Sequence, residues 1–554
     1  MNLSTEGSPP RPTPMQPEIQ ALRALAVALV VVFHLFPTGL RGGFIGVDVF
    51  FVISGFLITR QIAQELAAGT FSFRSFFARR ARRLLPAAGL VLATVMLVTW
   101  AFRPRFQWQA TIEGIWGSTF YVQNWVLARS ATDYFNDAPT AVQHFWSLSV
   151  EEQFYFVWPS LLAALARGSN TKRQIVGLSV VVLASFVASI FTFRSAPAFS
   201  YFATHVRAWE FGVGGLLVFA PRFRAEALGA KIASLVGFVV LCVAAWLLDE
   251  AKLFAGWPLL PVVGSALVLV AGTPETRSWR GAVFRFPAVR YLGDVSYSLY
   301  LWHWPFLVWM DQDFPDAPPW IRVSGILAAS LSCAALTRHF IEEPLRLRSH
   351  ARANARESTR DARSVWAYGS IAALLFVSLG TSGWAWQQLR SDERVAEAFA
   401  KKLGKKAGVC VGADALRSPS CPPSRSTEFT PPLEGSQREF YQLEDVGYRD
   451  CFVKQTKTGI KLCHRGKSDA RHHVALVGDS HALQWAPAMT ALVERGDLRV
   501  TMAFRGSCPF NLARVIDGTQ KECGIWIDRV LDELARDESI DLVVTTSFAD
   551  KRFE

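Results

Sequence analysis

Long hydrophobic runs separated by short polar loops cover most of the chain up to residue 386. A bilayer core about 30 Å thick needs roughly 20 mostly apolar residues per helix, and by that criterion the pattern predicts about eleven transmembrane helices. Their approximate ranges are 20–37, 44–65, 84–102, 145–166, 174–194, 204–220, 231–248, 257–272, 288–310, 320–341 and 365–386. This pattern is typical of an α-helical polytopic membrane bundle.

The charge of the loops predicts how the bundle is oriented. Lys and Arg accumulate in the cytoplasmic loops of polytopic proteins. If the polar tail 1–19 is cytoplasmic, the loops that should share its side are all basic, namely 66–83, 167–173, 221–230, 273–287 and 342–364. No cleavable signal peptide is expected, because the first 20 residues are polar and Pro-rich and lead directly into a span. An odd number of spans then places everything after about residue 387 outside the cytoplasm.

One further segment, 107–128, is long enough to span but contains Glu113, Gln123 and Asn124. Counting it as a full crossing would invert every later loop and move the Arg-rich loops outside, against the charge rule. We therefore expect this segment to be interfacial or packed within an outer loop.

Composition agrees with a membrane protein. Of 554 residues, 51% are hydrophobic and only 19% are charged, which excludes an ordinary soluble globular protein and a disordered chain. The net charge of +12 would suggest nucleic-acid binding in a soluble protein, but basic cytoplasmic loops account for it here, so we expect a lipid bilayer and no nucleic acid as partner.

The last third of the chain has a different composition. From about Gln387 the long apolar runs stop, and six of the eight cysteines follow. An even number of cysteines outside the cytoplasm suggests disulfides, with fifteen possible pairings of six. Pairing between sequence neighbours is our working choice, which gives 410–421, 451–463 and 508–523.

Within this region a Pro-rich linker, 387–450, is followed by a stretch that alternates between strands and helices. Apolar strands are expected before Gly478, at 498–504 and at 540–547, with helices between them. This order predicts a parallel α/β sheet over 451–554. Ser480 follows the first strand at the start of a helix, where backbone N–H groups favour a nucleophile and its oxyanion. A purely structural helix N-cap is the alternative for Ser480.

Ionisable residues inside spans are costly and by default mark functional sites. Arg23 and His34 are eleven residues apart in the first span, which places them within about 20° of one helix face and about 16 Å apart along it. His34 suits a general base or a transiently acylated nucleophile. The alternatives are a snorkelling end residue for Arg23 and a hydrogen-bonded packing histidine for His34.

Further polar side chains interrupt other spans. The candidates for the path of a substrate are Ser54, His144, Trp146, Arg207 and Glu210, with Glu151 as a possible second catalytic group at the outer mouth of the fourth span. Ser54 could instead serve helix packing. Arg207 and Glu210 are an i,i+3 pair and could simply neutralise each other. The ninth span also contains Tyr297, Tyr300 and His303.

Seven motifs occur in a fixed order along this part of the chain. They are Arg23-x10-His34, FFVISGFL at 50–57, ARRARRLLP at 78–86, HFWSLSVEEQFYFVWP at 144–159, Arg207-x-x-Glu210, GDVSYSLYLWHWPF at 293–306 and IEEPLR at 341–346. In this order they resemble the membrane-bound acyltransferase family 3, over roughly residues 16–346. The resemblance implies an enzyme that takes an acyl group, usually acetyl, from cytosolic acyl-CoA and delivers it to a carbohydrate outside.

The resemblance also suggests roles for several residues. The family pattern favours Glu151 over Glu152 as the recurrent acid. The phosphates of acetyl-CoA would be bound by charge-assisted hydrogen bonds from arginines, the candidates being Arg23, Arg79, Arg80, Arg82 and Arg83. The alternative for the loop arginines is a topological signal alone.

The sequence VALVGDSHA at 474–482 resembles the first block of the SGNH hydrolase family, whose domains occur fused to family 3 acyltransferases. The resemblance implies Ser480 as the nucleophile and Gly506 as an oxyanion-hole donor. It also implies a base from a late Asp-x-x-His, yet no histidine follows His481. We therefore expect either a truncated gene product with a partial SGNH-like domain or a domain that no longer catalyses.

Together these observations predict a membrane O-acetyltransferase with a 20–346 acyltransferase domain, a basic loop and last helix over 347–386, the linker and the SGNH-like domain. The acceptor would be an extracytoplasmic polysaccharide such as lipopolysaccharide O-antigen, the location the bacterial cytoplasmic membrane, and the oligomeric state is left open. No Cys or His spacing fits a metal site. A proton-coupled transporter of a sugar or lipid, or a membrane-anchored esterase using Ser480, are the rival functions.

Overall fold

The structure is a computed structural model that forms two compact units, Met1–Trp386 and Gln387–Glu554. The residues it describes are 16–130, 139–166, 171–221, 227–249, 256–272, 279–344, 378–391, 394, 451–453, 459–494, 496, 498–506, 508, 510 and 521–546.

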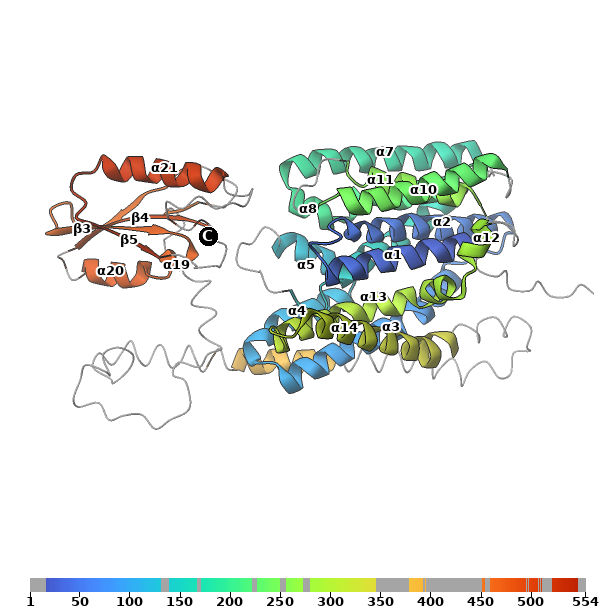
Figure 1. Cartoon of the computed structure of the whole chain (residues 1–554), viewed down its shortest axis with the longest axis horizontal. Helices are drawn as coiled ribbons and strands as arrows, with labels where there is room; N and C mark the ends of the chain where they lie inside the picture. Colours follow the sequence, from blue (N-terminus) through green and yellow to red (C-terminus); the bar gives the residue numbers. More distant parts are fainter. Residues whose placement is uncertain are drawn as a thin grey trace, which may run out of the picture. The chain divides into compact units, whose positions relative to one another are not determined.

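The first unit is entirely helical where it is described (Figure 1). Its helices are α1 Pro17–Leu35, α2 Gly46–Ala67, α3 Phe73–Phe102, α4 Trp108–Thr119, α5 Gln123–Ser130, α6 Phe145–Leu165, α7 Thr171–Ser195, α8 Pro197–Phe202, α9 Thr204–Leu216, α10 Leu228–Leu247, α11 Leu259–Val270, α12 Trp279–Phe284, α13 Pro287–Asp313 and α14 Pro319–Thr337. Short helical segments at Gly43–Ile45, Arg105–Gln107 and Arg338–Glu342 join or extend them.

Within the described ranges, six helices are long and apolar enough to cross a bilayer, namely Pro17–Leu35, Gly43–Ala67, Phe73–Phe102, Thr171–Ser195, Leu228–Leu247 and Pro319–Glu342. Each predicted span from 20–37 to 320–341 coincides with a helix, although several are shorter or more polar than this test requires. Of the predicted span 365–386, only the part from residue 378 is described, and it is helical. The prediction of a helical membrane bundle is therefore confirmed.

Segment 107–128 is not one continuous helix, as expected. α4 ends at Thr119, Tyr121 has a φ of 55°, and α5 begins at Gln123. Gln153 donates from its amide to the Tyr121 carbonyl at 2.7 Å, and Asn124 donates to the Phe202 carbonyl at 3.1 Å. Polar groups at the break are thus satisfied by protein, which backbone at membrane depth requires.

The helices pack around a buried core that α1, α2, α6, α9 and α13 share. α2 and α9 approach so closely that a Cβ at Gly55 would overlap the carbonyl group of Phe211. By contrast, α7 leaves Val176, Val180 and Leu183 more than 60% exposed, as expected of a lipid-facing helix.

The second unit is a mainly parallel sheet with helices on both faces (Figure 1). Its strands are β1 Phe452–Val453, β2 Cys463–Arg465, β3 His472–Gly478, β4 Leu498–Arg505 and β5 Leu542–Thr546, and its helices are α19 Ser480–Leu483, α20 Ala486–Glu494 and α21 Lys521–Ala535. The path runs β1-β4-β3-β5 with parallel pairing, and β2 pairs antiparallel with β4.

Side chains that alternate along β3 pack against the helices on the two faces of the sheet. Leu476 packs with α19 and α20, whereas Ala475 and Val477 pack with α21, because successive strand residues point to opposite faces. The predicted strands and the parallel sheet are confirmed.

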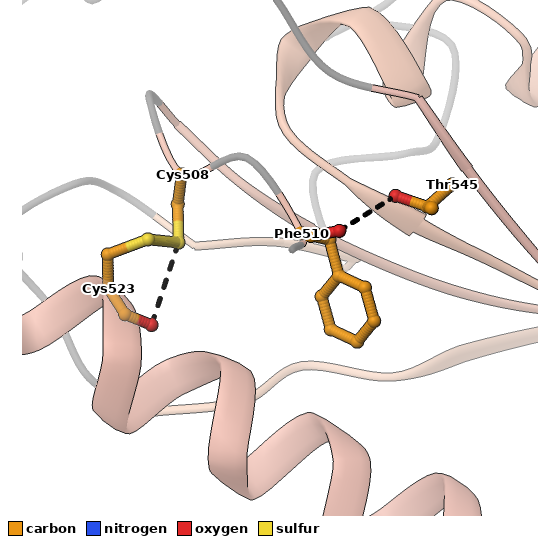
Figure 2. The surroundings of a disulfide bond; sticks show 4 residues. All are labelled: Cys508, Phe510, Cys523 and Thr545. Carbon is orange, nitrogen blue, oxygen red and sulfur yellow. Dashed lines mark hydrogen bonds between the residues drawn. A yellow bond between two sulfur atoms is a disulfide. The ribbon is translucent and has the colours of Figure 1, made fainter. Parts of the chain in front are cut away.

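Two of the three expected disulfides are present, Cys451–Cys463 and Cys508–Cys523. Cys410 and Cys421 lie outside the described residues. Figure 2 shows how Cys508, just after β4, is joined to Cys523 in the first turns of α21, while the neighbouring Phe510 carbonyl accepts a 3.5 Å hydrogen bond from the Thr545 hydroxyl of β5. The bond therefore fastens α21 to the ends of the strands that it covers.

Candidate active site

A cavity of about 720 Å³ opens among α1, α2, α3, α6 and α13. Its polar lining consists of Gln16, Arg23, Ser54, Arg60, Gln61, Gln64, Arg80, Arg83, Ser147, Glu151, Tyr155, Arg285, Ser296, Tyr297 and Tyr300. Gln16 and Pro17, at the start of α1, lie on the side that loop charge predicts to be cytoplasmic. A cavity of this size can enclose much of a cofactor-sized ligand.

The cavity separates the predicted CoA-binding arginines into two groups. Arg23, Arg80 and Arg83 line it, whereas Arg79 and Arg82 are not among its lining residues. The predicted basic loop 66–83 is wrong in its second half, because these residues form the first turns of α3. On a helix, positions 80 and 83 share a face, position 82 lies well away from it, and position 79 lies at its edge.

Arg79 has a partner of its own. Its guanidinium contacts both carboxylate oxygens of Glu65, at 2.7 and 2.9 Å. In contrast, Arg60 and Arg285 line the cavity although the sequence analysis had not singled them out. The signal for Arg60 was available, since it lies inside the predicted span 44–65 and an ionisable residue within a span is by default a functional candidate.

Glu151 is the centre of a polar cluster on the cavity wall. The Ser54 hydroxyl donates to its Oε1 at 2.5 Å, and the Tyr155 hydroxyl donates to the same oxygen. The Arg80 guanidinium lies 3.2 Å from the centre of the Tyr155 ring and 3.9 Å from carboxylate oxygens of Glu151 and Glu152. Glu151 thus faces the same cavity as the α3 arginines, rather than a separate outer mouth.

His34 does not line this cavity and instead belongs to a cluster of histidines. Its Nδ1 lies 3.1 Å from Nε2 of His303, and the Trp304 ring packs edge-on at 4.7 Å. The His144 ring lies 5.8 Å from that of His303. Both ring nitrogens of His144 are buried without a hydrogen-bond partner among the described residues.

One layer of side chains separates the histidine cluster from the cavity. Tyr300 and Ser147 both line the cavity, and their hydroxyl oxygens are 2.6 Å apart. The Tyr300 hydroxyl also donates to the backbone carbonyl of His144 at 2.9 Å. His303 contacts the Tyr300 backbone carbonyl and His34 contacts His303, so the candidate base His34 lies beyond both residues as seen from the cavity.

Arg207 and Glu210 form a buried ion cluster elsewhere in the bundle. Arg207 Nε lies 3.1 Å from Glu210, and its NH2 group donates to Asp48 at 2.7 Å. The ring of Tyr201 lies 5.6 Å from the same guanidinium, and Trp146 packs against Tyr201 at 5.1 Å. One guanidinium thus faces two buried carboxylates, of which Asp48 was not predicted as a partner, and a substrate-path role for Arg207 and Glu210 stays a prediction.

In the second unit, Ser480 begins α19 directly after β3. The N-cap is Asp479, whose carboxylate accepts from the His481 backbone N–H at 2.8 Å. The structural N-cap alternative for Ser480 is therefore wrong. Gly478 has a φ of 150°, and a Cβ there would meet the Thr546 carbonyl oxygen at 2.7 Å, so the turn that presents Ser480 requires glycine.

The structure bears on two further residues near Ser480, His481 and Gly506. The His481 side chain is 41% exposed and faces Asp479, with Nδ1 3.2 Å from the carboxylate, so it is directed to its own neighbour. The Gly506 backbone N–H donates to the Val453 carbonyl at 3.2 Å. An oxyanion role for Gly506 would require that hydrogen bond to open.

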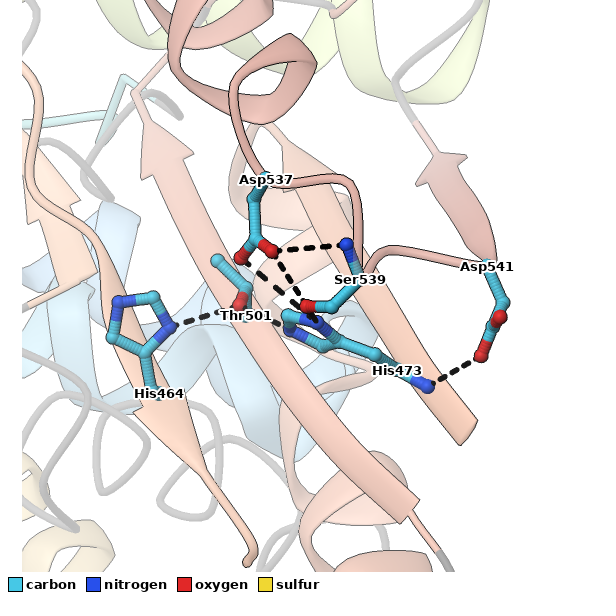
Figure 3. A network of polar contacts seen from close by, with 6 residues as sticks. All are labelled: His464, His473, Thr501, Asp537, Ser539 and Asp541. Atoms are coloured by element: carbon cyan, nitrogen blue, oxygen red, sulfur yellow. Dashed lines mark hydrogen bonds and ion pairs between the residues drawn. The ribbon is translucent and has the colours of Figure 1, made fainter. Parts of the chain in front are cut away.

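Two other histidines of this domain, His464 and His473, share one polar network (Figure 3). His473 lies near the start of β3, whereas Ser480 follows the end of that strand. His473, at the start of β3, is hydrogen-bonded through Nε2 to the Thr501 hydroxyl at 2.7 Å and through Nδ1 to the Ser539 hydroxyl at 2.8 Å. His464 contacts the same Thr501 hydroxyl at 2.9 Å. Since β3 rises about 3.3 Å per residue, roughly 20 Å separates this network from Ser480.

The surroundings of His473 and Asp537 shift the pKa values of both groups. Burial lowers the pKa of His473, the charge of Arg499 adds to the effect, and Asp537 opposes it. Hydrogen bonds from Ser539 lower the pKa of Asp537. His473 is therefore held neutral as a structural group, and it is too far away to serve Ser480 as a base.

Comparison with known proteins agrees with both halves of this description. A family model described as an acyltransferase domain matches residues 16–339, and one described as an SGNH domain fused to such domains matches residues 450–553. No solved structure matches the chain.

Two named relatives each align with 60% of the chain. The peptidoglycan O-acetyltransferase OatA of Listeria monocytogenes is 30% identical over 349 residues, which cover 60% of this chain and 56% of that protein. The O-acetyltransferase OatA of Staphylococcus aureus is 30% identical over 345 residues, covering 60% and 57%. The match thus spans little more than half the length of these relatives. On the family match, the chain belongs to the acyltransferase family 3 proteins that carry a fused SGNH domain.

Proposed function

We propose that this protein is a membrane O-acyltransferase that moves an acyl group, acetyl in the first instance, from acyl-CoA to a hydroxyl of an extracytoplasmic polysaccharide. The observation that carries the proposal is the cavity of about 720 Å³ lined by Arg23, Arg80 and Arg83, with His34 connected to its lining residue Tyr300 through His303. The arginines of the cavity suit the binding of an anionic acyl donor. The histidine beyond the cavity wall suits proton transfer during the reaction.

The arginines are suited to the phosphates of acetyl-CoA. Arg23 and Arg83 come from different helices and face one cavity, and Nε of Arg80 is buried without a hydrogen-bond partner among the described residues. Guanidinium groups bind phosphate oxygens in bidentate fashion. The donor would enter from the cytoplasmic side, where α1 begins.

His34 would carry the proton in the transfer. The acceptor hydroxyl oxygen bonds to the acyl carbon, the carbon–sulfur bond breaks, and the hydroxyl proton passes through the His34 imidazole to the departing thiolate. If His34 is acylated first, its nitrogen displaces the thiolate and the acceptor oxygen then displaces the nitrogen, with the same products. Glu151 is held by Ser54 and Tyr155 in front of Arg80 and would orient the donor.

The fused domain would complete the reaction outside the cytoplasm of a bacterial cell. The two disulfides support an oxidising location for it. Ser480, at a glycine-dependent turn, would accept the acyl group as an ester and pass it to a sugar hydroxyl. Because the Listeria relative is named a peptidoglycan O-acetyltransferase, peptidoglycan is the first acceptor to test, and lipopolysaccharide O-antigen is the second.

The test uses proteoliposomes that contain the whole protein, acetyl-labelled acetyl-CoA outside, and peptidoglycan fragments or O-antigen in the lumen. We expect wild-type protein to label the luminal glycan, and His34→Ala to abolish labelling. Ser480→Ala should abolish glycan labelling but leave release of CoA thiol. His205→Ala serves as a matched control, because the His205 ring stacks on Trp125 and does not line the cavity.

Each contrary result selects a rival. Labelling that survives His34→Ala but not Ser480→Ala would favour an anchored esterase acting in reverse. No labelling of either glycan, together with uptake of an unmodified sugar, would favour the transporter.

A further inference from the structure

A second histidine, His303 of α13, contacts the proposed base. The Nε2 atom of His303 lies 3.1 Å from Nδ1 of His34, although the two residues are 269 positions apart. The other ring nitrogen of His303, Nδ1, lies 2.6 Å from the backbone carbonyl oxygen of Tyr300. His303 is therefore engaged through both nitrogens at once, and its side chain is 2% exposed.

These two contacts assign the protons. A carbonyl oxygen can only accept a hydrogen bond, so the Nδ1 atom of His303 must carry the hydrogen that points to Tyr300. A neutral imidazole has one N–H, which leaves the Nε2 atom of His303 as an acceptor. The 3.1 Å contact is then a bond in which Nδ1–H of His34 donates to His303.

This proton assignment determines which ring nitrogen of His34 can react. With its hydrogen on Nδ1, the Nε2 atom of His34 carries the lone pair that a base or nucleophile needs. We propose that His303 is a positioning residue for the acyl transfer, because it holds His34 in the tautomer that presents Nε2 to the reacting group. This inference rests on the proposed function, since it concerns the histidine that would carry the transfer.

The arrangement also fits the charge that develops during the reaction. When Nε2 of His34 accepts a proton or an acyl group, the ring becomes cationic and its Nδ1–H donates more strongly to His303. The neighbouring Trp304 ring packs on His34 at 4.7 Å and is itself held by donation from Nε1 to the Thr140 carbonyl at 2.8 Å. His144 and Tyr300 are the other titratable side chains whose rings lie beside that of His303 among the described residues.

Three substitutions at position 303 test this role. The amide of Gln reaches the position of Nε2 and offers an oxygen that accepts from His34, the shorter amide of Asn does not reach it, and Leu has no acceptor. We expect His303→Leu and His303→Asn to lower kcat on the order of 100-fold, and His303→Gln to restore most of it. The KM for acetyl-CoA should not change, because His303 does not line the arginine-lined cavity.

A spectroscopic measurement is independent of turnover. In protein with nitrogen-15 histidines, the His34 signals, identified by their loss in His34→Ala, should report a protonated Nδ1 and an unprotonated Nε2. His303→Leu should remove that preference. As a matched control, His339→Gln replaces a histidine whose ring contacts Phe340, and wild-type kinetics are expected.

The outcomes distinguish the two proposals. If His34→Ala is inactive while the Leu, Asn and Gln variants at position 303 all match wild type, the positioning role is refuted and the proposed function stands. If His34→Ala retains activity, the proposed function itself fails. A His34 tautomer with hydrogen on Nε2 in the wild type would also overturn the inference. Should the Leu variant not fold, the comparison of Gln with Asn still decides.

Discussion

The membrane unit and the C-terminal unit each contain a histidine whose place in the sequence suggests a catalytic role. The two histidines have opposite surroundings in the structure. His34 is contacted by His303, which comes from a helix 269 residues later, and is covered by Trp304. His481 is adjacent to Ser480 but is 41% exposed and faces Asp479. Adjacency in sequence therefore says little about which histidine is oriented for chemistry, because orientation needs a partner placed by tertiary packing.

The largest expected effect comes from exchanging the two histidines for alanine. We expect His34→Ala to reduce acyl transfer by on the order of 10³-fold, since it removes the proton carrier. His481→Ala should remain close to wild type, because its ring is exposed and contacts the neighbouring Asp479. The rates of glycan labelling in proteoliposomes measure both. Equal losses in the two variants would remove the contrast between the units.

The disulfide that fastens α21 provides the next largest effect. Replacing both Cys508 and Cys523 by Ala opens a loop with a sequence separation of 15 and should lower the free energy of unfolding of the C-terminal unit by about 3 kcal/mol. Hydrogen exchange of α21 amides in the whole protein measures this change. Cys242→Ala, which removes a free cysteine of the membrane unit, is the control.

A smaller effect distinguishes the two faces of α3. Arg83→Gln should raise the KM for acetyl-CoA roughly tenfold or more, because a charge-assisted hydrogen bond contributes about 1.5–3 kcal/mol. Arg79→Gln should change KM little, since its partly exposed pair with Glu65 is worth at most about 1 kcal/mol. Steady-state kinetics decide, and a higher KM for Arg79→Gln alone would reverse the assignment of the two faces.

The smallest effect concerns pH and the histidine network of the second unit. Because burial lowers the pKa of His473, the unfolded chain takes up this proton first as the pH falls. The stability that His473 contributes is present at neutral pH and is lost below its unfolded pKa of about 6.5. In His473→Gln this acid-dependent loss should shrink, as measured by hydrogen exchange of β3 between neutral and mildly acidic pH. His472→Gln, at an exposed neighbour, should behave like wild type.

Local patterns in the chain were sufficient for much of this architecture. Apolar runs located the helices, the polar residues Gln123 and Asn124 marked the interrupted segment, and cysteine order predicted Cys451–Cys463 and Cys508–Cys523. These features depend on neighbours within one element or one short loop, so hydropathy and spacing contain the necessary information.

Other features depended on residues far apart along the chain. Whether an α3 arginine faces the cavity depends on how that helix packs against α4 and α13 and on the partner of each side chain, since Arg80 and Arg83 line the cavity whereas Arg79 pairs with Glu65. Asp48 joins Arg207 only because α2 packs on α9. The basic cluster seen in sequence indicated the helix that contributes arginines to the cavity, but it could not say which of those arginines line it.

The sequence thus indicated which chemical groups are present, but it did not predict how these groups are arranged in space. The succession of spans, the presence of an arginine and a histidine in the first helix, and the strand and turn before Ser480 follow from order along one chain. The hydrogen bond from His34 to His303, the occupied N–H of Gly506 and the distance of His473 from Ser480 follow from how separate elements meet. The physical reason is that hydrogen bonds and ion pairs act over a few ångströms, while the residues that make them are hundreds of positions apart.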